Sequence, residues 1–183
     1  MAFRSALGGS MSTSIAAVFL ALWSLLPAVA SAKDAEVLHL PPLHLEFPST
    51  WQFDDSKSPI EGAGPDGDKV LITVMRRKPD ASADSPSMAS LASGFAGGPM
   101  VEIAAKDGLK VIRAVGAFPT PDGKVGYSAA SEESRALGGK TYFVQYLFAS
   151  PGALIYLTFE GKGEAGPAML RFDKFLETQR WDD

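Results

Sequence analysis

The chain has 183 residues with 17 Lys and Arg against 21 Asp and Glu, so its formal net charge is −4, and it has no cysteine. This acidic balance argues against a nucleic-acid partner or an anionic membrane surface, because both attract basic patches. Without cysteine, disulfides and lipid-modified cysteines are excluded, and an exported domain of this composition must be stabilised by a packed core.

The first 32 residues are typical of an export signal. Arg4 is the only charged side chain before Lys33, and an apolar run over residues 15–26 precedes the small residues 30–32. This order predicts a signal peptide over residues 1–32, with cleavage between Ala32 and Lys33. The alternative is an uncleaved anchor, although the run is shorter than the roughly 20 residues that a spanning helix needs.

Cleavage at this point would leave one domain over residues 33–183. Those 151 residues carry 16 basic and 21 acidic side chains, a net charge of −5. A chain of this length is usual for a single domain with a sizeable core, and no linker is long enough to divide it. We therefore expect a periplasmic or secreted protein of the bacterial cell envelope.

The mature chain begins with extended segments. Residues 36–40 precede a break at Pro41-Pro42, and apolar residues alternate over 43–47, which predicts a first core strand. Trp51 and Phe53 are expected to carry the chain over a sheet edge into a polar, Gly- and Pro-rich connection over 54–69. Residues 70–75 are apolar at every position but one, so both faces of the strand are apolar, which predicts a central position in the sheet.

A helix is predicted next, with Ser85 as its N-cap and Pro86 at its first position. Met88, Leu91, Ala92 and Phe95 would form its apolar stripe, and the glycines before Pro99 would end it. Residues 100–106 fit both strand and helix, so their conformation stays open. Residues 110–118 and 124–132 predict a pair of strands joined by a turn.

The C-terminal third predicts a hairpin followed by a helix. Residues 141–148 and 154–160 are aromatic and β-branched, and Pro151-Gly152 between them favours a tight turn. Pro167 suits the first position of a helix that presents Met169, Phe172, Phe175, Leu176 and Gln179 on one face. The order of elements indicates an α+β fold, an antiparallel sheet covered by helices.

The chain resembles the PsbP and DcrB-like family, whose members share a Mog-type α/β/α sandwich. The resemblance lies in the run LHLEFP over 43–48 with Trp51, in residues 142–146, in Pro151-Gly152, and in the run LTFEG over 157–161 before the last helix. It implies the α/β/α sandwich and a binding or assembly role, since members include a photosynthetic extrinsic subunit, bacterial envelope proteins and secretion adaptors. The short signal argues against a photosystem role, and the family has no common active site.

The sequence carries none of the common local motifs of an active site. The chain has no Gly-x-Ser-x-Gly, Ser-x-x-Lys, His-Glu-x-x-His or phosphate-loop motif, so we predict no catalytic residue, cofactor or metal site and a protein that is not an enzyme. His39 and His44 need not share a face and are expected to be polar residues of an edge strand. The pairs Asp54-Asp55 and Asp66 with Asp68 are expected to be turn residues rather than Ca²⁺ ligands.

Two surface features remain as candidates for recognition. The basic run 76–78 lies beside Asp80 and Asp84 and is expected to be a solvated loop rather than an anion clamp. Aromatic side chains with polar tips are favoured at recognition surfaces. The sequence therefore predicts a candidate partner surface formed by four residues: Trp51, Tyr142, Tyr146 and Tyr156.

In the second hairpin strand, Tyr156 and Thr158 point to the side opposite Ile155, Leu157 and Phe159. Their face is either a ligand or partner surface or, in a sandwich with helices on both faces, buried, and we expect burial. The leading hypothesis is an exported, non-catalytic protein that binds another envelope protein as an assembly factor or adaptor, an immunity protein being a special case. The alternative is a small-ligand or metal-ion binding protein of the periplasm. A hydrolase would need a pocket with a poised base.

Overall fold

The computed structural model describes residues 35–182 apart from 42, 83, 107, 122 and 137. The predicted signal peptide and its cleavage site therefore lie outside the described residues. The elements of the described chain follow one another in this order: β1 (Glu36–Leu40), β2 (Leu43–Phe47), β3 (Gln52–Asp54), β4 (Ile60–Ala63), a 3₁₀ turn (Pro65–Gly67), β5 (Lys69–Arg76), α1 (Met88–Gly97), α2 (Pro99–Ala104), β6 (Leu109–Ala117), β7 (Val125–Ser134), β8 (Lys140–Ala149), β9 (Ala153–Lys162), α3 (Ala165–Glu177) and β10 (Arg180–Trp181).

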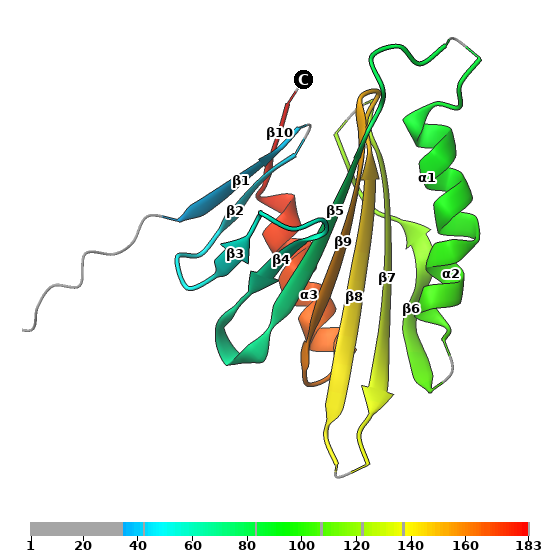
Figure 1. Ribbon diagram of the computed structural model, residues 1–183. Helices are drawn as coiled ribbons and strands as arrows, with labels where there is room; N and C mark the ends of the chain where they lie inside the picture. The colour runs from blue at the N-terminus through cyan, green and yellow to red at the C-terminus, as the bar shows by residue number, and fades with distance from the viewer. Residues whose placement is uncertain are drawn as a thin grey trace, which may run out of the picture. The chain divides into compact units, whose positions relative to one another are not determined.

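The centre of the domain is a seven-stranded antiparallel sheet in the order β3-β4-β5-β9-β8-β7-β6 (Figure 1). The predicted C-terminal hairpin forms its middle, with Ala149 opposite Leu154 at the closed end. There Ser150 N donates a hydrogen bond to Ala153 O at 2.9 Å, which confirms the tight turn that Pro151-Gly152 predicted. The predicted pair of strands before it is also confirmed as β6 and β7.

One face of the sheet packs against α3 and a small sheet of β1, β2 and β10. Phe172 and Leu176 of α3 are 4% and 3% exposed and belong to the same buried cluster as Phe159 of β9. Leu43 and Leu45 of β2 extend this cluster beside α3. The aromatic and aliphatic side chains of this layer form the main core, and their removal from water is the chief stabilising contribution.

The other face of the sheet packs against α1 and α2, which lie over its β6–β8 side (Figure 1). The buried side chains of these helices are Met and Ala, and Ala92 meets Ala129 and Ala149 of the sheet in one cluster. Small side chains on both sides allow helix and sheet to approach closely. The domain is thus an α+β fold, an antiparallel sheet with helices on both faces, as predicted.

This second helical layer stops short of β5. Leu71 and Met75 point to the side of α1 and α2 and are 42% and 52% exposed, whereas Ile72 between them is 1% exposed. The predicted central strand is confirmed, since β5 lies between β4 and β9, but only one of its two apolar faces is buried. A half-buried strand is recognised in a sequence by alternating apolar and polar residues. β5 lacks this alternation because both of its faces carry aliphatic residues, so the sequence does not show that only one face is covered.

Both helix starts differ from the prediction. Ser87 rather than Ser85 caps α1, because Ser87 Oγ accepts from Ser90 N at 3.0 Å. The open stretch 100–106 is largely α2, and α3 begins at Ala165, two residues before Pro167. Pro167 consequently lies inside the first turn, where its missing N–H has no helical partner to lose.

The polar connection over 54–69 is not only a loop, because β4 lies inside it and β3 overlaps its start. These short strands pair with each other and extend the sheet beyond β5, with Phe53 opposite Gly62. A side chain on Gly62 would collide with the Phe53 ring, so glycine permits this close pairing.

No helix among the described residues is long and apolar enough to cross a membrane.

Candidate functional site

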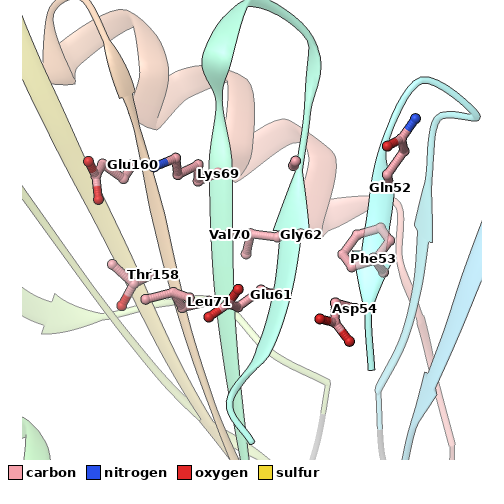
Figure 2. Close-up of a pocket in the computed structure, with 11 residues that line it drawn as sticks. Gln52, Phe53, Asp54, Glu61, Gly62, Lys69, Val70, Leu71, Thr158 and Glu160 are labelled. Carbon is pink, nitrogen blue, oxygen red and sulfur yellow. The ribbon is translucent and has the colours of Figure 1, made fainter. Parts of the chain in front are cut away.

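The part of the sheet that α1 and α2 leave uncovered forms a hollow. The register places Lys69 opposite Glu160 and Leu71 opposite Thr158, and β4 and β3 continue both rows. Opposite residues of antiparallel strands point to the same side of a sheet, so these side chains form parallel rows across four strands. They line a hollow of about 530 Å³, and Figure 2 shows Lys69 and Glu160 at one end of it.

The two carboxylates at the β3–β4 end of the hollow share one lysine. Lys57 Nζ lies 3.2 Å from Asp54 Oδ2 and 2.9 Å from Glu61 Oε2. Hydrogen bonds from Ser56 and Lys57 lower the pKa of Asp54, and those to Glu61 and Asp54 raise the pKa of Lys57. All three groups are exposed, so this cluster sets local charge and adds little stability.

A second hollow, of about 400 Å³, continues the first toward α2. Leu71, Thr158 and Glu160 line both hollows. Its other walls come from the end of α2 and from β6, β7, β8 and β9, and consist of the following side chains: Ile103, Lys106, Leu109, Ser131, Glu133, Phe143, Gln145 and Tyr156. The two hollows therefore form one surface that runs from β3 to α2.

Two buried oxygen atoms in this second hollow have no hydrogen-bond partner among the described residues, Gln145 Oε1 and the Tyr156 hydroxyl. Gln145 is 3% exposed. Burial raises the pKa of the Tyr156 hydroxyl. Because folded proteins pair nearly all buried polar atoms, two unpaired oxygens in one hollow require an explanation.

Three of the four residues predicted as a partner surface lie in the core instead. Trp51, Tyr142 and Tyr146 are 6%, 2% and 0% exposed, and all three belong to the cluster between the sheet and α3. They are therefore unavailable to a partner. Tyr156 is partly exposed in the second hollow, although Phe95 of α1 packs edge-on against its ring at 5.1 Å. A role for Tyr156 in recognition stays a prediction.

The polar tips of the two buried tyrosines bind acidic residues. Tyr142 donates to Asp68 Oδ1 at 2.6 Å, and Arg171 of α3 donates to Asp68 Oδ2 at 2.7 Å. Tyr146 donates to Asp173 of α3 at 2.6 Å. Burial and these carboxylates raise the pKa of both tyrosines. The hydroxyls thus hold α3 on the sheet.

The candidate metal ligands are placed as follows. Asp68 is bound to Tyr142 and Arg171, and Asp54 is bound to Lys57. No group of three or more His, Asp or Glu side chains among the described residues is placed to hold a metal ion. The absence of a metal site remains a prediction.

The two histidines face each other across the β1–β2 hairpin. His39 is opposite His44 in the register, their Nδ1 atoms are 2.7 Å apart, and His44 Nε2 lies 2.7 Å from Asp182 Oδ1. They therefore do share a face, which the five-residue spacing alone did not require. This contact joins β2 to the chain just after β10, in keeping with a structural role.

The basic run 76–78 lies at the end of β5. Arg77 N donates to Gly152 O at 2.9 Å, and its guanidinium reaches the Ser82 carbonyl at 3.5 Å. Arg76 and Lys78 are exposed. These contacts fit a solvated loop held at its first residues.

The fold is PsbP-like, an antiparallel sheet between two layers. The chain is similar to PsbP (CyanoP) of the cyanobacterium Synechocystis, with 11% identity over 85% of this chain and 98% of that chain and a TM-score of 0.51. It is also similar to LpqN of Mycobacterium tuberculosis, a protein involved in cell envelope biogenesis, with 14% identity, coverage of 82% and 87%, and a TM-score of 0.50.

At these identities the two structures establish the fold alone, and they confirm the PsbP-like architecture that the sequence predicted. Neither the profile of a known sequence family nor the sequence of a curated protein matches the chain.

Proposed function

We propose that the protein is an exported, non-catalytic module of the bacterial cell envelope that binds another envelope protein through the uncovered sheet face. The observation that carries this proposal is the exposure of Leu71 and Met75 on an internal strand. Protein interfaces commonly have an apolar centre and a polar rim, and exposed aliphatic side chains with charged groups around them follow this arrangement. The envelope role of the structurally similar LpqN supports the compartment.

The charges around Leu71 favour a specific contact with a partner over non-specific hydrophobic association. Lys69 and Glu160 stand opposite each other, and neither forms an ion pair with another described residue. A partner that presents both a cationic and an anionic group beside an apolar patch would be complementary to this face. Such complementarity contributes to specificity and to the rate of association.

Affinity capture with two matched variants tests the proposal. Leu71→Glu places a charge on the uncovered face, and Leu170→Glu does the same on α3, where Leu170 is 66% exposed. Neither change buries a charge, so both proteins should fold. We expect the unchanged protein and Leu170→Glu to recover the same protein from envelope extracts and Leu71→Glu to lose it. Equal recovery by both variants, or no specific partner at all, would contradict the proposal.

A second candidate function, small-ligand binding in the periplasm, has an observation of its own. Gln145 Oε1 is buried without a partner among the described residues, on a wall of a 400 Å³ hollow. That volume falls in the usual range of small-molecule sites, about 300–1,000 Å³. A melting screen across ligand classes tests this function, because a ligand that binds only the folded state raises the unfolding temperature.

A further inference from the structure

We propose that the second hollow, between α2 and the sheet, binds a small organic cation, a primary ammonium group carried on a hydrocarbon chain. The inference rests on the second candidate function and assigns it a ligand class. It does not depend on a partner protein.

The first step is the direction of the unpaired oxygens. Val144 and Tyr146 belong to the α3-side core, so Gln145 between them points to the opposite side, into the hollow. Gln145 is opposite Thr158, which places Tyr156 at the diagonal position on the same face. Diagonal neighbours in antiparallel strands lie roughly 7–8 Å apart, so the two side chains belong to the same wall of the hollow. Both oxygens are covered by protein atoms, so a ligand bonds to them once the side chain turns toward the hollow.

The Gln145 oxygen selects a hydrogen-bond donor, and the Tyr156 hydroxyl can accept from one as well. The Gln145 oxygen only accepts, and an ammonium group has three donors and no acceptor. Hydrogen bonds to charged groups are stronger than those between neutral groups. A primary ammonium is therefore a matching partner for this wall of the hollow.

The charges of the lining select a cation over an anion. Glu133 and Glu160 supply two carboxylates and Lys106 one ammonium group, so the lining carries a net charge of −1. None of the three forms an ion pair with another described residue. A carboxylate ligand would meet Lys106 but would also face two like charges, whereas an ammonium ligand has two available counter-charges.

The remaining walls suit a hydrocarbon chain. Leu71 and Ile103 are 42% and 41% exposed although both line the hollow, and Leu109 and Phe143 complete the apolar surface. A chain of several methylene groups would cover these side chains and remove apolar area from water. The ligand is thus amphipathic, with its charged end toward the glutamates and the Gln145 amide.

Gln145 also allows a binding role to be separated from a structural one. A buried oxygen without a partner lowers the stability of the unliganded protein. Leucine has a similar volume and no polar atom, so Gln145→Leu should raise the unfolding temperature without ligand while weakening ligand binding. A purely structural glutamine would show the reverse, a loss of stability with unchanged binding.

The test compares three probes of equal chain length, 1-hexylammonium, hexanoate and 1-hexanol, by thermal unfolding and titration calorimetry of the full protein. We expect only 1-hexylammonium to raise the unfolding temperature. Gln145→Leu and Glu160→Gln should each weaken its binding about tenfold or more, as expected for a lost hydrogen bond or counter-charge. Glu177→Gln, an exposed position on α3, should leave the affinity unchanged.

Three results would overturn the inference. Equal stabilisation by hexanoate or hexanol would show that the hollow does not select an ammonium group. No effect of 1-hexylammonium would remove the site altogether. Unchanged binding to Gln145→Leu and Glu160→Gln would place the ligand elsewhere. The capture experiment with Leu71→Glu has an independent outcome, since it can succeed when all three probes fail.

Discussion

Two adjacent aliphatic residues of β5 test the one-sided burial on which the uncovered face depends. Ile72 points toward α3 and is 1% exposed, whereas Leu71 points to the other side and is 42% exposed. Leucine and isoleucine are isomers, and the two residues are neighbours on the same strand, so each serves as the control for the other. We predict that alanine substitution costs much more stability at Ile72 than at Leu71.

The magnitude follows from burial. Truncation to alanine removes three carbon atoms, or about 2.4 kcal/mol at about 0.8 kcal/mol for each buried CH₂. At Ile72 a cavity adds to this loss, so the expected cost is about 3–4 kcal/mol. Leu71 keeps 42% of its surface exposed, which scales its loss to about 1.4 kcal/mol without a cavity.

Urea unfolding followed by circular dichroism measures both costs, provided that the denaturant dependence is the same for the two variants. For a domain of this size each kcal/mol lowers the unfolding temperature by about 2–4 °C, so the two variants should be clearly separated. Equal losses at Leu71 and Ile72 would refute the reasoning, because they would mean that both faces of β5 are covered.

Three further predictions concern the core and its polar contacts. Phe159→Ala should cost about 3–5 kcal/mol in urea unfolding, since its buried ring stacks on Phe172 with centroids 3.9 Å apart; a cost below 1 kcal/mol would contradict this packing. Tyr142→Phe removes the hydrogen bond to Asp68 and should cost about 1–2 kcal/mol by calorimetry, and unchanged stability would refute that role. The hydrogen bond from Lys140 lowers the pKa of Glu132. The stability that Glu132 contributes should therefore be complete above about pH 4.3 and be lost as the pH falls through the lowered pKa. A difference in unfolding free energy between the unchanged protein and Glu132→Gln that persists unchanged at pH 2 would argue against the ion pair.

Elements with strong local signals could be predicted from the sequence. The β8–β9 hairpin combines aromatic and β-branched strands with Pro151-Gly152, and both signals depend only on neighbouring residues. The start of α1 could not be fixed in this way, because Ser85 and Ser87 are equally good N-caps by type. β3 and β4 were missed because they are three and four residues long and depend on pairing with each other and with β5.

The candidate site was harder to predict, since it depends on how much of the sheet the helices α1 and α2 cover. Alternation along β9 indicated that Tyr156 and Thr158 share a face, but not that α1 and α2 leave part of that face uncovered. Tyr142 and Tyr146 were assigned to the surface because their polar tips favour it. Their acceptors Asp68 and Asp173 are 74 and 27 residues away in the chain, so no local pattern reveals that these hydroxyls are satisfied inside.

The most direct test of the proposed binding face is photocrosslinking in intact cells. A p-benzoylphenylalanine in place of Leu71 would lie on the uncovered face, and the same residue in place of Leu170 would lie on α3, where the side chain is more exposed. We predict a discrete crosslinked envelope protein from position 71 and none from position 170. A crosslink to the same protein from position 170 alone, or none from position 71, would contradict the proposal that this face binds the partner.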